Sequence, residues 1–229
     1  MRNHIPRSAL IFDLDGTLVD NVYLHVLAWQ RALEAEGIEL SVWRIHRRIG
    51  MSGGLFVNAL LREIDQPIDA DRVKRIGDHH AEFFAPLASQ VRPLPGSRTL
   101  LQTLTDLSVP WAIATSGHMR SAHFSLDMLG VSSDTATIIT RDLVERAKPD
   151  PDLFIAAANK LDLDIGDCII VGDSIWDMLA AQRARALGVG LRSGGYGSEE
   201  LERAGAYRVY DDPLDLLHHL DEIGVRQPR

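Results

Sequence analysis

The sequence has few of the features that mark secreted, membrane-spanning or nucleic-acid-binding proteins. Its 229 residues include one cysteine, Cys168, so no disulfide can form within the chain. No apolar run approaches the roughly 20 residues that cross a membrane, and residues 1–12 lack the pattern of a secretory signal. The 24 basic residues are outnumbered by 32 acidic ones, whereas nucleic-acid binders usually carry a basic surplus. We therefore expect a cytoplasmic protein that binds neither nucleic acid nor membrane.

Two common phosphate-binding motifs and a zinc pattern are also missing. Neither GxxxxGK[ST] nor GxGxxG occurs, and the nine histidines show no spacing typical of zinc ligands. These absences disfavour nucleotide and dinucleotide sites of those types, and they disfavour a zinc site.

What the sequence does have is an alternation of short apolar runs and helical patterns from residue 96 onward. This alternation predicts βαβ units and hence an α/β fold with a mostly parallel sheet. We expect strands at 8–13, 111–115, 137–140, 168–172, 188–191 and 207–210. We expect helices at 96–107, 119–129, 151–161, 174–187 and 198–204.

Residues 20–92 break this alternation, because their patterns are helical throughout. Apolar residues recur at helical spacing in 23–37, where Gly37 is a stop signal, and in 54–64 and 69–85. The sequence therefore predicts a helical module inserted after the first strand. We divide the chain into a core of residues 1–19 and 93–229 and an insert of residues 20–92.

Two aspartates, Asp13 and Asp15, stand at the end of the first predicted strand. Residues two apart in an extended chain point to the same side, so the two carboxylates would face one way. A buried charge is costly unless it is paired or coordinated, and a like charge nearby adds to the cost. A turn at Asp15–Gly16 would explain Asp15 but not Asp13. A positive partner is therefore expected beside them.

Further polar residues stand where other predicted strands end or helices begin. Hydroxyl and backbone N–H groups of Thr115, Ser116 and Gly117 could hold phosphate oxygens, although Ser and Thr also suit a helix cap. Lys148 could offset phosphoryl charge, although a solvated loop lysine is the simpler interpretation. Asp177 fits a capping box with Ser174.

Ligands of open α/β sheets bind beyond the carboxyl ends of the strands. Asp13, Asp15 and Asp173 should therefore converge there as an oxygen-rich anionic site. Mg²⁺ prefers carboxylates, waters and substrate phosphates, so this cation is the expected partner.

Together, these segments resemble the four motifs of the haloacid dehalogenase (HAD) superfamily, phosphatase type. They are DLDGT at 13–17, a strand ending in Thr115, Lys148 before Pro149, and GDSIWD at 172–177. The insert is similar to the cap of the subgroup that includes phosphoglycolate phosphatases, β-phosphoglucomutases and phosphonatases. The resemblance implies a Rossmann-like core, an all-helical cap, and a small phosphorylated metabolite as the substrate.

The resemblance also implies a role for each motif residue. Asp13 would be the nucleophile that forms an aspartyl-phosphate, and Asp15 would be the general acid and base. Thr115 and Lys148 would hold the phosphate. Mg²⁺ would be bound by Asp13, the main-chain carbonyl of Asp15, and Asp173, with support from Asp177.

Single residues disfavour two branches of the superfamily, the dehalogenases and the phosphonatases. Dehalogenases lack the second aspartate of the first motif, which here is Asp15. Phosphonatases use a cap lysine, and Lys74, the one lysine of the insert, is not near that position. We therefore expect a Mg²⁺-dependent phosphomonoester hydrolase acting on a sugar phosphate or phosphoglycolate, working as a monomer or weak homo-oligomer.

A sugar phosphomutase is the alternative, and a non-catalytic binding protein is a third hypothesis. DNVYLHVLAW resembles the mutase segment, and His25 falls where mutases carry a cap histidine. However, mutases usually have Glu where Gly172 stands, and an arginine where Gly53 stands. The loop 47–54 is the expected specificity element, in which Arg47 and Arg48 could partly replace that arginine.

Overall fold

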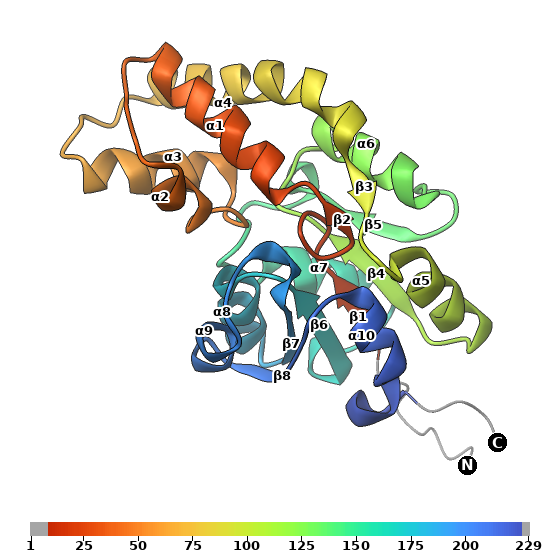
Figure 1. Ribbon diagram of the computed structural model, residues 1–229. Coiled ribbons are helices and arrows are strands. Elements are labelled where there is room, and N and C mark those ends of the chain that lie inside the picture. Colours follow the sequence, from red (N-terminus) through yellow and green to blue (C-terminus); the bar gives the residue numbers. More distant parts are fainter. Residues whose placement is uncertain (1–8, 226–229) are drawn as a thin grey trace.

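The computed structural model (Figure 1) describes residues 9–225, and it contains a six-stranded parallel sheet in the order β5-β4-β1-β6-β7-β8. Ser8 of the first predicted strand, and most of the segment considered for a signal, lie outside the described residues. The strands are β1 (Ala9–Phe12), β4 (Trp111–Ala114), β5 (Thr137–Ile139), β6 (Cys168–Gly172), β7 (Leu187–Leu191) and β8 (Ala206–Tyr210).

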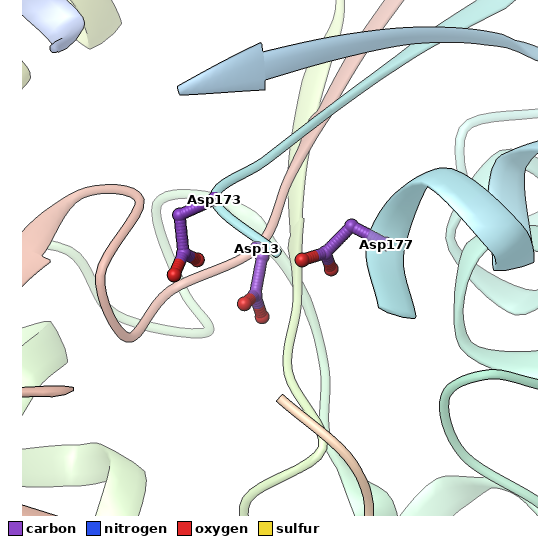
Figure 2. Close-up of side chains that lie close together, drawn as sticks. All are labelled: Asp13, Asp173 and Asp177. Atoms are coloured by element: carbon purple, nitrogen blue, oxygen red, sulfur yellow. The ribbon is translucent and has the colours of Figure 1, made fainter. Parts of the chain in front are cut away.

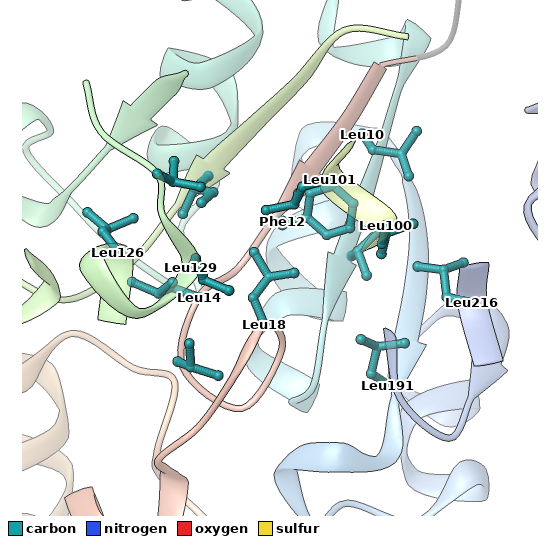
Figure 3. Packing of buried hydrophobic residues seen from close by; sticks show 14 of the residues in the cluster. Leu10, Phe12, Leu14, Leu18, Leu100, Leu101, Leu126, Leu129, Leu191 and Leu216 are labelled. Carbon is teal, nitrogen blue, oxygen red and sulfur yellow. The ribbon is translucent and has the colours of Figure 1, made fainter. Parts of the chain in front are cut away.

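Helices cover both faces of this sheet. Side chains alternate along β1, so neighbouring residues of this strand pack against different helices. Leu10 and Phe12 pack in one buried cluster with leucines of α5 (Ser97–Asp106), α6 (Met119–Leu129) and α10 (Pro213–His218), as Figure 3 shows. Ala9 and Ile11 pack on the other face against α7 (Asp152–Lys160) and α8 (Ile175–Ala184). The central strand is thus buried on both sides, which leaves its carboxyl end as the place for polar groups.

Short elements complete this part of the chain. Helix α9 (Ser198–Arg203) packs beside β7 and β8. The 3₁₀ helices are η1 (Ala85–Gln90), η2 (Arg141–Leu143), η3 (Ile165–Asp167), η4 (Arg192–Gly194) and η5 (Leu220–Ile223).

Residues 22–84 form four α-helices that lie together at one end of the molecule (Figure 1). They are α1 (Val22–Ala35), α2 (Val42–His46), α3 (Gly53–Glu63) and α4 (Ala70–Phe84). These helices bury an apolar cluster of their own around Trp29, Leu33 and Phe56. Two short antiparallel strands, β2 (Val19–Asp20) and β3 (Arg92–Pro93), connect this helical segment to the sheet. We call residues 22–84 the helical segment.

The predicted fold class, α/β with a Rossmann-like parallel core and a helical insertion, is confirmed. The expected helix 174–187 is wrong at its end, because Arg185 adopts a left-handed conformation (φ 60°) after α8, and β7 begins at Leu187. The sequence patterns missed the short helices α2 and α10, which have 5 and 6 residues. Within residues 9–225, no helix is both long and apolar enough to span a bilayer.

Candidate active site

Three aspartates meet at the carboxyl ends of β1 and β6. Asp13 follows β1, Asp173 follows β6, and Asp177 lies in the first turn of α8. Figure 2 shows Asp13 between the other two side chains, and carboxylate oxygens of all three lie within 4.8 Å of one another. All three residues are buried. The predicted convergence of Asp13 and Asp173 is therefore present in the structure.

Lys148 is the positive partner of this cluster. Its side chain is fully buried, and its Nζ lies 2.6 Å from Oδ1 of Asp13 and 2.9 Å from Oδ1 of Asp177. The alternative of a solvated loop lysine is therefore wrong. Asp177 also caps α8, because its Oδ2 accepts hydrogen bonds from the Ser174 hydroxyl (2.6 Å) and backbone N–H (3.1 Å). The expected capping box is present together with the ion pair.

The balance of charge here is negative, since three buried carboxylates share one ammonium group. Burial raises the pKa of Asp13 to about 7, with Lys148 opposing this rise and Asp177 adding to it. Burial and then Asp177 raise the pKa of Asp173 well above its ordinary value. Burial alone would lower the pKa of Lys148, but Asp13 and Asp177 outweigh it and raise that pKa. A further cation would relieve this repulsion.

The donor set fits a hard divalent cation such as Mg²⁺, because the three side chains that meet here all offer carboxylate oxygens. Asp13 and Asp173 are the stronger candidates for direct ligands, since both oxygens of Asp177 are engaged by Lys148 and Ser174. Asp173 is held by a 2.8 Å hydrogen bond from Thr17 Oγ1. A Cβ at Gly194 would come within 1.7 Å of Asp173 Oδ2, so this carboxylate fills the space that a side chain there would need.

Asp15 lies outside this cluster, and its carboxylate faces the helical segment. Its Oδ1 accepts hydrogen bonds from Asn21 Nδ2 at 2.5 Å and from Ser125 Oγ at 3.4 Å, and His25 Nε2 lies 3.8 Å away. Burial would raise the pKa of Asp15, but His25 and Asn21 outweigh it and lower that pKa below its ordinary value. Asp13 and Asp15 therefore have pKa values displaced in opposite directions, which is typical of carboxylates with different tasks.

The loop after β4 places Thr115, Ser116 and Gly117 beside the aspartates. Thr115 is buried, and its Oγ1 accepts a 3.0 Å hydrogen bond from the Gly117 N–H. Ser116 donates to the Gly50 carbonyl at 3.0 Å, so its hydroxyl joins the core to the helical segment. The helix-cap alternative for Thr115 and Ser116 is wrong, because the N-cap of α6 is His118.

A cavity of about 300 Å³ lies between this loop and the helical segment. Asp13, Asp15, Thr115 and Lys148 line one part of it. The helical segment contributes the predicted residues His25, Arg48 and Gly53. It also contributes Lys74 and several residues that the sequence did not single out, among them Trp29, Phe56 and His80. The helical periodicity marked these three only as parts of helices.

The two arginines of loop 47–54 are both engaged by carboxylates. Arg47 is not among the cavity residues, because it reaches Glu200 at 2.5 Å and lies 4.2 Å above the Tyr196 ring. Arg48 lines the cavity, but it donates to the Glu63 carboxylate and, at 3.1 Å, to the Arg44 carbonyl.

In the absence of metal, the free energy of unfolding should increase as the pH falls, and protonation of Asp13 should account for part of this increase. Its folded pKa of about 7 lies above the ordinary 3.8, so the folded state binds this proton more tightly. The resulting stability is present at low pH and is lost as the pH rises toward 7. We expect the gain in urea midpoint between about pH 8 and pH 5.5, measured with chelator, to be smaller in Asp13→Asn than in wild type. Equal gains in both proteins would contradict this assignment.

Known proteins resemble this chain along most of its length. The model of the haloacid dehalogenase-like hydrolase family matches residues 8–185. A hydrolase from Pseudomonas syringae has a crystal structure with a TM-score of 0.94 and 53% identity, covering 95% of this chain and 100% of that one. Phosphoglycolate phosphatase of Neisseria meningitidis is 30% identical over 84% of this chain and 83% of its own. Hexitol phosphatase A of Escherichia coli is 29% identical over 95% of this chain and 94% of its own length. The chain therefore belongs to the haloacid dehalogenase-like hydrolases, the family of enzymes that its four motifs predicted.

Proposed function

We propose that this protein is a Mg²⁺-dependent phosphomonoester hydrolase that works through an aspartyl-phosphate on Asp13. The observation that carries the proposal is the buried arrangement of Asp13, Lys148, Asp173 and Asp177 beside a 300 Å³ cavity. An anionic nucleophile, a fixed cation and oxygen ligands for a metal are the parts that phosphoryl transfer requires. The names of two relatives, a phosphoglycolate phosphatase and a hexitol phosphatase, support the same reaction class.

The reaction proceeds in two steps. A carboxylate oxygen of Asp13 forms a bond to phosphorus while the bond to the ester oxygen breaks, and Asp15 gives its proton to that leaving oxygen. Water then attacks phosphorus and gives a proton to the Asp15 carboxylate. The bond between phosphorus and the Asp13 oxygen breaks, so that phosphate is released and the Asp13 carboxylate is restored. Lys148 balances charge on the transferred group throughout. When bound, Mg²⁺ would add further positive charge at Asp13 and Asp173.

The surroundings of Asp15 favour one of its two duties. Hydrogen bonding from Asn21 and the nearby His25 lower its pKa, so they favour the carboxylate that accepts a proton from water. The protonated form used in the first step has to form against these contacts. We therefore expect the acid and base roles of Asp15 to depend on how it is held by Asn21 and by His25 of the helical segment, which we propose acts as a closing cap.

Two observations favour hydrolysis over the phosphomutase alternative. A Cβ at Gly172 would come within 2.3 Å of the Cβ of Asp177, so the glutamate typical of mutases could not stand there without displacing Asp177. A second phosphate would also need a cation, and Arg47 and Arg48 are already bound to Glu200 and Glu63. Lys74 and Arg120, which also line the cavity, are both paired with Asp78, at 2.6 Å and 3.7 Å.

The substrate class we propose is a sugar phosphate or phosphoglycolate, and the protein would act in the cytoplasm as a monomer or weak homo-oligomer. The test is phosphate release from a panel of small phosphate esters, with Mg²⁺ and with chelator. We expect release that needs the metal and is restored by adding it back. Metal-independent release would contradict the metal role, and conversion of β-glucose 1-phosphate without free phosphate would favour the mutase.

A further inference from the structure

The lysine and arginine side chains that line the cavity are already paired with carboxylates. Within the described residues they are Arg48, Lys74, Arg120 and Lys148. Lys148 is bound to Asp13, where the phosphoryl group would react, and Arg48 is bound to Glu63. Lys74 and Arg120 share a single carboxylate, that of Asp78. These pairs decide which charges the leaving part of a substrate would meet.

Asp78 differs from Glu63 because it lines the cavity itself. Its Oδ2 lies 2.6 Å from Nζ of Lys74, one turn earlier in α4, and its Oδ1 lies 3.7 Å from Nη2 of Arg120 in α6. The hydrogen bond from Lys74 lowers the pKa of Asp78 below its ordinary value, so this group is a carboxylate at neutral pH. It stands between a cation of the helical segment and a cation of the core, with one oxygen toward each.

Most of the other residues that the helical segment contributes to the cavity are apolar or glycine. The apolar ones are Trp29, Ile49, Met51, Phe56, Val73 and Ala81. The exceptions, His25 and His80, lie 3.1 Å apart, and His25 also faces the Asp15 carboxylate at 3.8 Å. This surface suits the carbon skeleton of a substrate, and it offers an anionic group little compensation for the water that such a group would lose.

We propose that Asp78 is a specificity-determining residue: its carboxylate takes the place that an anionic group of the substrate would occupy between Lys74 and Arg120. The cavity then selects phosphate esters whose leaving group is uncharged. This inference rests on the proposed hydrolase function and narrows its substrate class.

The physical basis of this selection is repulsion between like charges. A carboxylate or second phosphate that approached Lys74 and Arg120 would have to displace Asp78 or lie beside it. Such a repulsive element is a common source of specificity. A hydroxyl group meets no repulsion there and can donate a hydrogen bond to the Asp78 carboxylate. Sugar and polyol phosphates should therefore be better substrates than phosphoglycolate or phosphorylated sugar acids.

Two esters with the same carbon chain measure this selection. Sorbitol 6-phosphate ends in a hydroxymethyl group, and 6-phosphogluconate ends in a carboxylate at the same carbon. We expect kcat/KM of wild type to favour the alcohol by about tenfold or more. In Asp78→Asn, which keeps the size of the side chain and removes its charge, this ratio should fall by about tenfold, the order expected for one charge a few ångströms away. Because the Asp78 side chain is 48% exposed, we expect this variant to fold.

Two further variants separate this role from a general effect of charge or folding. Asp71→Asn is the matched control, because Asp71 is an exposed residue of α4 that is not among the cavity residues. Its ratio should stay within about twofold of wild type. Lys74→Met leaves Asp78 with less compensation, so its ratio should rise instead of falling. Added salt should reduce the difference between wild type and Asp78→Asn, because these side chains are partly exposed.

The proposal is overturned if wild type hydrolyses the two esters with similar kcat/KM. It is equally overturned if the ratio of Asp78→Asn equals that of Asp71→Asn. If Asp78→Asn does not fold, Lys74→Met decides, and an unchanged or lower ratio in that variant contradicts the role of Asp78.

A binding measurement keeps this inference separate from the proposed function. A wild type that releases phosphate from no ester of the panel refutes the hydrolase. If neither six-carbon ester is hydrolysed, calorimetry with Mg²⁺ compares their affinities without turnover. Equal affinity ratios in wild type and Asp78→Asn would then overturn the specificity role, and a shift toward the acid in Asp78→Asn would support it.

Discussion

Asp13→Asn should lower metal-dependent phosphate release by about 10⁴-fold or more, the order seen when a covalent nucleophile is removed. An amide oxygen is a poor nucleophile, and no other carboxylate occupies the same position. Asp15 points toward Asn21 and the helical segment, and Asp177 is bound by Lys148 and Ser174. Neither of them can therefore replace Asp13 in the bond to phosphorus.

Acid quenching during turnover tests the covalent step itself. With a substrate labelled on phosphorus, wild type should retain label on the protein and Asp13→Asn should retain none. Asp127→Asn is a matched control, because Asp127 is an exposed residue of α6. Label bound to Asp13→Asn, or turnover within about tenfold of wild type, would refute Asp13 as the nucleophile.

Replacing Lys148 by Met should cost both turnover and stability. The side chain is fully buried and contacts Asp13 and Asp177, so its loss would leave two carboxylates without their ammonium partner. Removing one member of a buried ion pair typically destabilises a protein by about 3–5 kcal/mol. With chelator present, we expect a loss of that order at about pH 8. The loss should be smaller at about pH 5.5, where Asp13 takes up a proton.

Urea unfolding of the Lys148→Met variant at the two pH values measures this effect. Lys160→Met is the control, because Lys160 is exposed at the end of α7 and the substitution is the same. A Lys148→Met protein within about 1 kcal/mol of wild type at both pH values would show that Lys148 does not compensate the buried carboxylates.

The parts of the site that the sequence could predict are those belonging to single strands. Asp13 and Asp173 each follow a wholly apolar strand, so their exit from the sheet and their shared edge could be inferred from local patterns. In a parallel sheet the carboxyl ends of neighbouring strands lie at the same edge, so the two aspartates are expected to be close together. The register that pairs Phe12 with Val171 brings these ends together.

The parts that could not be predicted depend on contacts between distant helices. His80 is separated by 55 residues from His25, and nothing in the pattern of α4 distinguishes it from His79. The engagement of Arg47 by Glu200 joins residues 153 apart. Such partners are decided by how the helical segment packs on itself and on the sheet, which a local period does not encode.

The ribbon formed by β2 and β3 has a consequence for how this architecture could have arisen. Val19 pairs with Pro93, so the chain leaves the sheet and returns to it at neighbouring points. The 73 residues between these two positions could be shortened, lengthened or exchanged without moving any strand that carries Asp13 or Asp173. Genetic insertion at this junction therefore allows the reacting groups to be inherited unchanged while the enclosure around the substrate diversifies. A chimaera with its exchange points at Val19 and Pro93 would test whether the sheet accepts a different insert.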